Sequence, residues 1–144
     1  MGLVVYTGGS FDLLHWAHGD FLKKCRELAG PDGKVSVALN TDEFILAYKG
    51  KGLVMNYAER AAALMHLKWV DEVIPNVGGA DSKPAIEYVK PDLIVIGSDW
   101  ARRDYYTQMG FDQDWLDERG IGLVYIPYTA GISSTEIKAR LAKR

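Results

Sequence analysis

Two histidines, His15 and His18, follow a glycine-containing turn near the start of the chain. The turn comes after the apolar run 3–6, which is typical of a buried strand, and before apolar residues spaced for one helix face. Side chains three residues apart share a helix face, so both imidazoles are expected to point into the crevice at the strand's carboxyl end. The helix start also favours an anion such as phosphate, through its free N–H groups and its dipole. Each histidine alone would also suit a structural role, but strand, turn and helix together favour phosphate binding.

Three cationic side chains are candidates for the same ligand. Lys49 and Lys51 lie in a short stretch with Gly50 and Gly52 that could fold over phosphates, and a solvated surface loop is the alternative. Arg60 stands in the first turn of a predicted helix, where its charge is poorly placed relative to the helix dipole. That placement favours an anionic partner for Arg60.

A second helix N-terminus is predicted at residues 131–136, Gly131-Ile132-Ser133-Ser134-Thr135-Glu136. Ser133 with Glu136 three residues later is a capping box, whatever the function of the segment. The serine and threonine hydroxyls and the free N–H groups would also form a second anion site.

Alternating strand and helix patterns predict the scaffold that brings these groups together. Such alternation favours a mostly parallel five-stranded sheet with helices on both faces. Asn56 and Glu59 predict a capping box at one helix start. Because right-handed crossovers place the carboxyl ends of all strands on one rim, the candidate groups are expected to converge there. The predicted strands are 2–7, 34–39, 71–75, 92–96 and 121–126, and the predicted helices 16–29, 57–68, 82–89, 113–119 and 134–143.

Composition limits the class of protein. A chain of 144 residues with 48% hydrophobic and 25% charged residues predicts one globular domain, residues 1–144. A net charge of −2 argues against a general binder of nucleic acid or membrane surfaces. Cys25 is the only cysteine, so no internal disulfide can form, and a buried, inert thiol is expected. No signal peptide or membrane-spanning run is apparent, which predicts a cytoplasmic protein.

Several motifs resemble one known family. GSFDLLHWAH at residues 9–18 resembles the GxFDxxHxGH motif of the cytidylyltransferase-like nucleotidyltransferases. Further matches follow in the order of that family, nearly to the end of the chain. Within the family, the resemblance is closest to the glycerol-3-phosphate cytidylyltransferases. The further matches lie at residues 40–44, 49–51, 58–60, 70–75, 97–100 and 131–135.

This resemblance implies a Rossmann-like, doubly wound α/β fold and a transferase activity. CMP would pass from CTP to a small phosphorylated alcohol, with glycerol 3-phosphate the leading acceptor, releasing pyrophosphate and a CDP-alcohol. The attacking phosphate is already ionised, so the site needs positioning and charge neutralisation rather than a base. Mg²⁺ is expected with CTP. A homodimer is also expected, from the family and from the apolar residues at 64–70.

The resemblance also implies roles for individual residues. Asp12 would orient the turn or help to hold Mg²⁺, and Trp100 would stack in the site or pack in the core. The expected catalytic residues are His15, His18, Lys49 and Arg60. The expected nucleotide- and phosphate-binding residues are Gly9, Ser10, Phe11, Asp12, Lys51, Asp99, Trp100, Thr129, Gly131, Ile132, Ser133, Ser134 and Thr135.

Three positions depart from the family pattern. Ala17 replaces the glycine of HxGH, which narrows the approach of a phosphate to the backbone. Tyr128 and Ala130 replace the arginine and glutamate of the family's RTEGIST motif, and Arg102 or Arg103 could supply the missing cation. Two alternatives therefore stay open. One is an ATP-dependent adenylyltransferase of the heptose-phosphate or flavin type, and the other is a non-catalytic nucleotide-binding module.

Overall fold

The computed structural model describes residues 2–98, 105–127 and 131–144 of the chain. Its centre is a sheet whose strands all run parallel, in the order β3-β2-β1-β4-β5. The predicted five-stranded parallel sheet is therefore confirmed. The strands are β1 (Val4–Gly9), β2 (Lys34–Leu39), β3 (Glu72–Pro75), β4 (Leu93–Gly97) and β5 (Gly122–Ile126).

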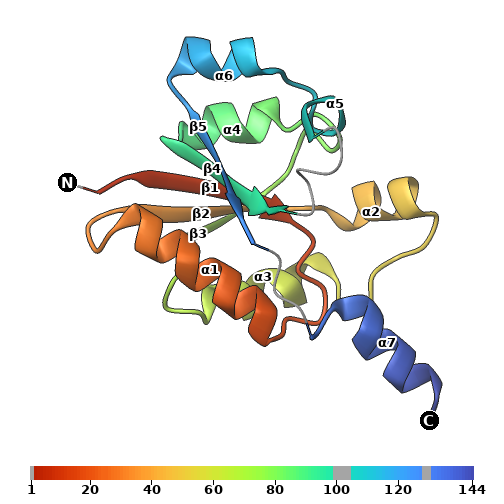
Figure 1. Ribbon diagram of the computed structural model, residues 1–144. Coiled ribbons are helices and arrows are strands. Elements are labelled where there is room, and N and C mark those ends of the chain that lie inside the picture. The colour runs from red at the N-terminus through yellow and green to blue at the C-terminus, as the bar shows by residue number, and fades with distance from the viewer. Residues whose placement is uncertain (1, 99–104, 128–130) are drawn as a thin grey trace.

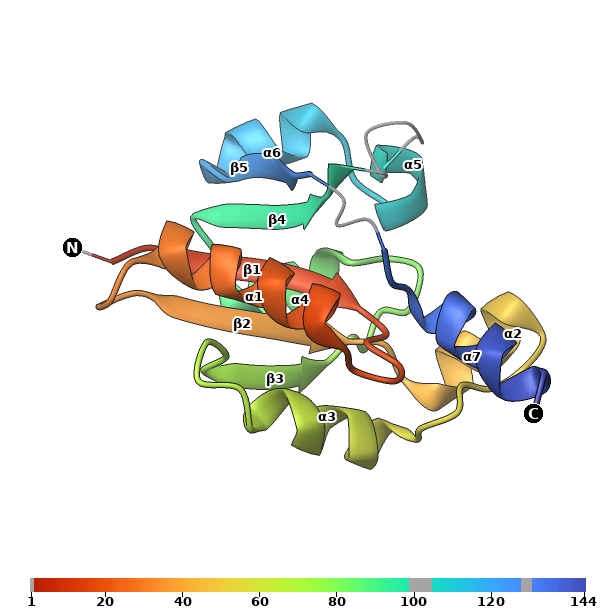
Figure 2. The same ribbon diagram turned by 60° about the horizontal axis from the view of Figure 1, so that its bottom comes forward.

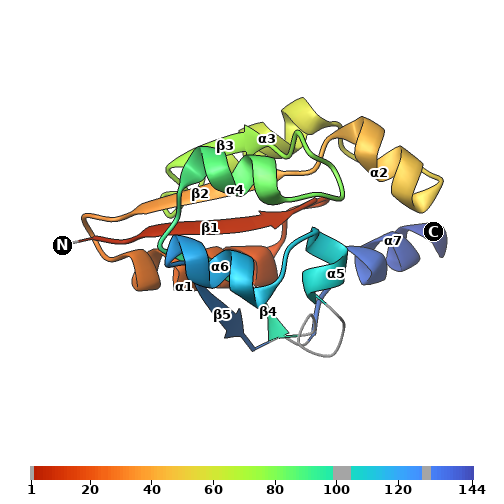
Figure 3. The same ribbon diagram turned by 90° about the horizontal axis from the view of Figure 1, so that it is seen from above.

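Helices cover both faces of this sheet (Figure 1). One face carries α1 and α3, the opposite face carries α4 and α6, and α2 and α7 lie beyond the carboxyl ends of the strands (Figures 1 and 3). The layers are those of the expected doubly wound α/β fold. The helices are α1 (Trp16–Ala29), α2 (Asp42–Lys49), α3 (Tyr57–Met65), α4 (Lys83–Val89), α5 (Tyr105–Met109), α6 (Gln113–Arg119) and α7 (Ser134–Ala142).

The strand order reverses between β1 and β4. From β1 the chain proceeds outward to β2 and β3, and it then returns to β4 and β5 on the other side of β1. In Figure 2 the strands β1 and β4, which pair in the sheet, lie side by side. Open α/β sheets bind ligands at such a point, because the loops on either side leave a crevice. We call residues 10–15, which connect β1 to α1, the histidine turn. The fold thus places the histidine turn at this crevice.

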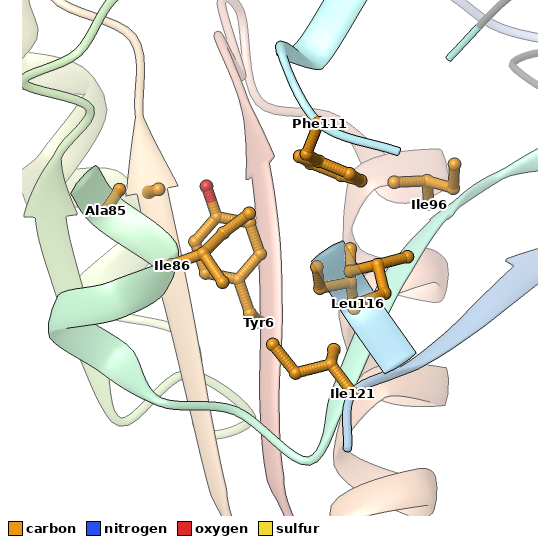
Figure 4. Packing of buried hydrophobic residues seen from close by; sticks show 9 residues of the cluster. Tyr6, Ala85, Ile86, Ile96, Phe111, Leu116 and Ile121 are labelled. Atoms are coloured by element: carbon orange, nitrogen blue, oxygen red, sulfur yellow. The ribbon is translucent and has the colours of Figure 1, made fainter. Parts of the chain in front are cut away.

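Apolar packing on both faces holds the sheet. Val5, Cys25 and Val35 belong to a buried cluster between the sheet and α1. On the other face Tyr6, Ile86 and Leu116 pack together, and Figure 4 shows them between β1 and the helices α4 and α6. Burial raises the pKa of the Cys25 thiol to about 12, in agreement with the expected inert cysteine.

The helices of the structure differ from the expected ones at three places. The helices α2 and α5 were not expected, and the helix predicted over 57–68 ends at Met65. The chain tightens after Met65, because the N–H groups of His66 and Leu67 bond to carbonyls three residues back. Leu64 and Val70 pack in the chain's own core, whereas Met65 is 50% exposed, so the chain itself covers only part of the apolar segment 64–70. The homodimer stays a prediction from the family resemblance.

Among the helices of the described residues, none has the length and apolar character needed to cross a membrane.

Candidate functional site

The histidine turn leaves β1 in a strained conformation. Phe11 and Leu13 have φ angles of 49° and 51°. This left-handed backbone conformation is rare for residues other than glycine. The turn delivers His15 to the N-cap of α1 in an extended conformation, and His18 to the end of its first turn. The two imidazole rings stack with centroids 3.8 Å apart. The predicted convergence of both histidines on one side of the helix start is therefore confirmed.

A backbone hydrogen bond orients His18. The backbone N–H of His15 donates to Nδ1 of His18 at 3.2 Å, so Nδ1 is the acceptor and the proton of a neutral ring sits on Nε2. Burial, and then the neighbouring His15, lower the pKa of His18 to about 4, and burial also lowers the pKa of His15. His18 is therefore neutral at pH 7 and offers Nε2–H as a fixed donor.

This shift predicts that stability depends on pH. The unfolded chain takes up a proton on His18 near pH 6.5, whereas the folded chain resists it down to about pH 4. The unfolded state then binds more protons, so the free energy of unfolding is expected to fall as the pH falls from 6.5 to 4. Urea unfolding measured across this range checks the slope.

His18→Gln supplies the matched comparison, because it keeps a donor near the position of Nε2 and does not titrate. The variant is expected to show a shallower slope between pH 6.5 and 4. An unchanged slope would contradict the assignment to His18.

Asp12 holds the turn to two distant segments. Its side chain is 4% exposed and accepts hydrogen bonds from the backbone N–H groups of Val54 and Met55, both at 2.9 Å. Lys138 of α7 forms an ion pair with the same carboxylate at 3.1 Å. Burial raises the pKa of Asp12, but the two amides and Lys138 outweigh it and lower the pKa overall. Of the two roles expected for Asp12, the structure supports orientation of the turn.

The second helix start meets the histidine turn, as predicted. The Ser134 hydroxyl donates to the Asp12 carbonyl at 2.5 Å, and the Ser133 hydroxyl accepts from the Glu136 N–H at 3.1 Å. Ser133 is therefore the N-cap of α7, while the Ser134 hydroxyl is already used within the protein. Gly131 has a φ angle of 103°, which favours glycine. Ile132 is half-buried, and Thr135 is exposed in the first turn of α7.

The contacts of Arg60 differ from those expected of a phosphate ligand, because they are all made within the protein. Its side chain is fully buried. Its NH1 atom donates to the carbonyls of Ser10 and Asn40, both at 2.9 Å, and its Nε atom donates to the Met55 carbonyl at 3.0 Å. Its NH2 atom pairs with Asp42 at 2.7 Å. The anionic partner inferred for Arg60 is thus a carboxylate of the protein, and Arg60 joins the ends of β1 and β2 to α2 and α3.

Lys49 and Lys51 differ in their position relative to the cavity. Lys49 is the last residue of α2 rather than part of a loop, and its neighbour Gly50 ends the helix in a left-handed conformation. Lys49 lines a cavity of about 500 Å³, whereas exposed Lys51 is not among the cavity residues. Of the two, Lys49 is the better placed for a ligand.

The cavity opens beside the carboxyl ends of the strands. It begins at Gly8 and Gly9, the last residues of β1, and at Ser10, and it extends between α2 and α5. Gly9 packs under the Phe11 ring, since an added Cβ would lie 3.0 Å from it. The Phe11 ring in turn contacts His18, with ring centroids 5.3 Å apart. Phe11 therefore packs against His18 and is not among the residues that line the cavity.

Some cavity residues were not predicted as functional. Asn76 follows directly after β3, so the rule that sites form at the carboxyl ends of strands could have identified it, whereas Asn40, after β2, begins the motif match at residues 40–44. Gln108 lies on α5, a helix that the sequence did not predict. The predicted Asp99, Trp100 and Thr129 lie outside the described residues, as do the family departures Tyr128 and Ala130 and the suggested Arg102 and Arg103.

The described residues contain no group of three carboxylate, histidine or cysteine side chains that could together bind the expected Mg²⁺. Asp12, the one metal ligand considered from the sequence, already binds Val54, Met55 and Lys138. The described residues thus do not fit a resident magnesium site.

Comparison with known proteins agrees with the motifs. The sequence matches the family model described as Cytidylyltransferase-like over residues 6–140. It is 36% identical over 138 residues to the glycerol-3-phosphate cytidylyltransferase of Bacillus subtilis (strain 168), covering 96% of each chain. It is 32% identical over 150 residues to the FAD synthase of Korarchaeum cryptofilum (strain OPF8), covering 99% of this chain and 94% of that protein.

A solved structure has the same fold. The lipopolysaccharide core biosynthesis protein from Thermoplasma volcanium GSS1 superposes with a TM-score of 0.69 and 26% sequence identity. The match covers 90% of this chain and 99% of that one. The resemblance inferred from short motifs therefore extends to the whole sheet and its helices.

Proposed function

The chain belongs to the cytidylyltransferase-like family, and we propose that it transfers CMP from CTP to a small phosphorylated alcohol. Glycerol 3-phosphate is the leading acceptor, and the products are a CDP-alcohol and pyrophosphate. The observation that carries this proposal is the His15–His18 pair at the start of α1, beside the start of α7. Two helix N-termini and a neutral imidazole donor form a site for a phosphate chain.

In the proposed reaction an oxygen of the acceptor phosphate attacks the α-phosphorus of CTP. A new oxygen–phosphorus bond forms, the bond from the α-phosphorus to the bridging oxygen breaks, and pyrophosphate leaves with that electron pair. The Nε2–H of His18 donates to the α-phosphate as negative charge develops, and His15 lies against the same ring. Because the pKa of about 4 leaves His18 neutral at pH 7, and the N–H of a neutral imidazole is a very weak acid, His18 stabilises the charge by a hydrogen bond without transferring a proton.

The acceptor is proposed to occupy the cavity beside the histidine turn. Gly8, Gly9 and Ser10 line its inner end, where the acceptor phosphate would approach the α-phosphate. Lys49 supplies a positive charge at the same cavity. Mg²⁺ is proposed to arrive bound to the triphosphate, where it would offset the phosphate charges. We also propose that the reaction takes place in the cytoplasm.

A second candidate function is adenylyl transfer from ATP to a flavin-type acceptor. The cavity supports it, because the aromatic rings of Tyr6, Phe44 and Tyr48 line a space of about 500 Å³, within the range of ligand-sized pockets. The similarity to an FAD synthase points the same way.

One assay separates these functions. Pyrophosphate release is measured with CTP or ATP, each combined with glycerol 3-phosphate, other phosphorylated alcohols or FMN. Turnover that requires CTP and glycerol 3-phosphate is the expected result. Turnover with ATP and FMN would replace the proposal by the second candidate, and tight nucleotide binding without turnover would indicate a binding module.

A further inference from the structure

Three polar side chains form a hydrogen-bonded chain across the tips of three strands. Asn76, after β3, donates through Nδ2 to Oδ1 of Asn40 at 3.1 Å. Asn40, after β2, donates through Nδ2 to Oγ of Ser10 at 3.0 Å. Ser10 follows β1, and all three residues line the cavity beside the histidine turn. We call Asn76, Asn40 and Ser10 the polar ladder.

The backbone fixes the direction of this ladder. Nδ2 of Asn76 also donates to the Gly79 carbonyl at 3.0 Å, and a carbonyl can only accept. A flipped Asn76 would place its oxygen against two acceptors, the Gly79 carbonyl and Oδ1 of Asn40. The orientation is kept although it leaves the buried Oδ1 of Asn76 without a partner among the described residues.

This direction determines what the last member can do. Because Asn76 donates to Asn40, the oxygen of the Asn40 amide faces Asn76 and its NH₂ group faces Ser10. The Ser10 hydroxyl therefore accepts at its oxygen and must direct its own proton elsewhere. Ser10 is half-buried at the inner end of the cavity, so the proton has the cavity as its free direction.

We propose that Asn76 and Asn40 are positioning residues that hold the Ser10 hydroxyl as a hydrogen-bond donor to the phosphate of the acceptor. This inference rests on the proposed function, since it assumes that the cavity takes a phosphomonoester. Arg60 assists by holding the carbonyls of Ser10 and Asn40, so the spacing of the two strand tips is fixed. A hydroxyl aimed before the ligand arrives needs no reorientation on binding.

Asn76→Asp tests the proposal by reversing the ladder. A carboxylate at position 76 cannot donate, so Asn40 is expected to flip and to donate its NH₂ group to the carboxylate. The Asn40 oxygen would then face Ser10, draw the hydroxyl proton away from the cavity and present a lone pair to the acceptor phosphate. Loss of one charge-assisted hydrogen bond predicts a KM for glycerol 3-phosphate raised about tenfold or more. The KM for CTP is expected to change little.

A double-mutant cycle distinguishes positioning from a general structural effect. Ser10→Ala alone should raise the acceptor KM by a similar factor, and the uncharged Asn76→Ala should add little to it, because the hydroxyl on which the ladder acts is gone. Multiplied effects in the double variant would overturn the proposal. Asn76→Ala, which leaves Asn40 unanchored, replaces Asn76→Asp if the charged variant does not fold, and a smaller rise in acceptor KM is expected from it.

Asn56→Asp is the matched control. Asn56 is the N-cap of α3, where aspartate caps equally well, and it lies outside the cavity residues. It makes the same change of net charge and should leave the acceptor KM unchanged.

Binding separates this inference from the proposed function. Calorimetry with glycerol 3-phosphate, without nucleotide, needs no turnover, so weaker binding to Asn76→Asp would support the ladder even if CTP proves to be the wrong nucleotide. Wild-type protein that neither binds glycerol 3-phosphate nor uses any phosphorylated alcohol would overturn both proposals. Normal turnover by the wild type, with equal acceptor binding in Asn76→Asp, would overturn the ladder alone.

Discussion

Replacing His18 by alanine is expected to lower kcat by about a hundredfold or more, with a modest change in the KM for CTP. The reason is that His18 offers a fixed, neutral Nε2–H to charge that develops during the reaction. His15→Ala should also lower kcat, because the two rings stack and form one unit. Steady-state pyrophosphate release, with folding checked by circular dichroism, measures both effects.

Two conservative variants distinguish the role of the acceptor Nδ1 of His18 from that of the donor Nε2. Asparagine can accept the His15 N–H in place of Nδ1 but lacks a donor at the position of Nε2. Glutamine places an amide nitrogen near Nε2. We therefore expect His18→Asn to fold normally with low kcat, and His18→Gln to retain more activity than His18→Asn.

The third histidine, His66, provides the control. It lies exposed at the end of α3, where Nδ1 is 2.7 Å from the Ala62 carbonyl. His66→Ala should leave kcat unchanged. Activity in His18→Ala equal to that of the wild type would remove His18 from the mechanism.

Most of the scaffold could be predicted from periodicity and turn chemistry. The strand at 34–39 and the helices at 16–29 and 113–119 have the expected bounds, because apolar runs, glycine turns and capping residues mark their ends. The helix α2 was missed although its signals are present, with Thr41 as N-cap and Gly50 beyond its end. The motif match at residues 40–44 identifies this segment only as one that follows a strand, and it carries no information about a helix.

The site was predicted less completely than the fold. Sequence spacing identified the histidine pair, because both residues belong to one local turn and helix. The partners of Asp12, Arg60 and Ser134 are groups 5 to 126 residues away. A polar side chain near a site can face the ligand or the protein, and only the folded chain decides which. Asp12 and Arg60 face the protein, and they hold the turn that carries the histidines.

The second large effect is expected at Arg60. Arg60→Ala leaves the carbonyls of Ser10, Asn40 and Met55 without their buried donor and creates a cavity. Each unsatisfied buried acceptor costs about 1–3 kcal/mol, so the free energy of unfolding should fall by roughly 3 kcal/mol or more. Urea unfolding measures the loss. Asp42, the ionic partner, is 46% exposed, so Asp42→Asn should cost only about 1 kcal/mol or less.

Arg26 is the matched control for Arg60, because it makes the same kind of contact at the opposite end of the sheet. Its guanidinium donates to the carbonyls of Gly30, Gly33 and Trp69 and pairs with Asp71, before the starts of β2 and β3. Arg26→Ala should therefore also destabilise the fold. The folded fraction of that variant should nevertheless keep its kcat/KM, since no cavity or histidine-turn residue depends on Arg26. In Arg60→Ala the folded molecules should lose kcat/KM as well, because Ser10 and Asn40 are no longer held. Equal activity per folded molecule in the two variants would show that Arg60 contributes stability alone.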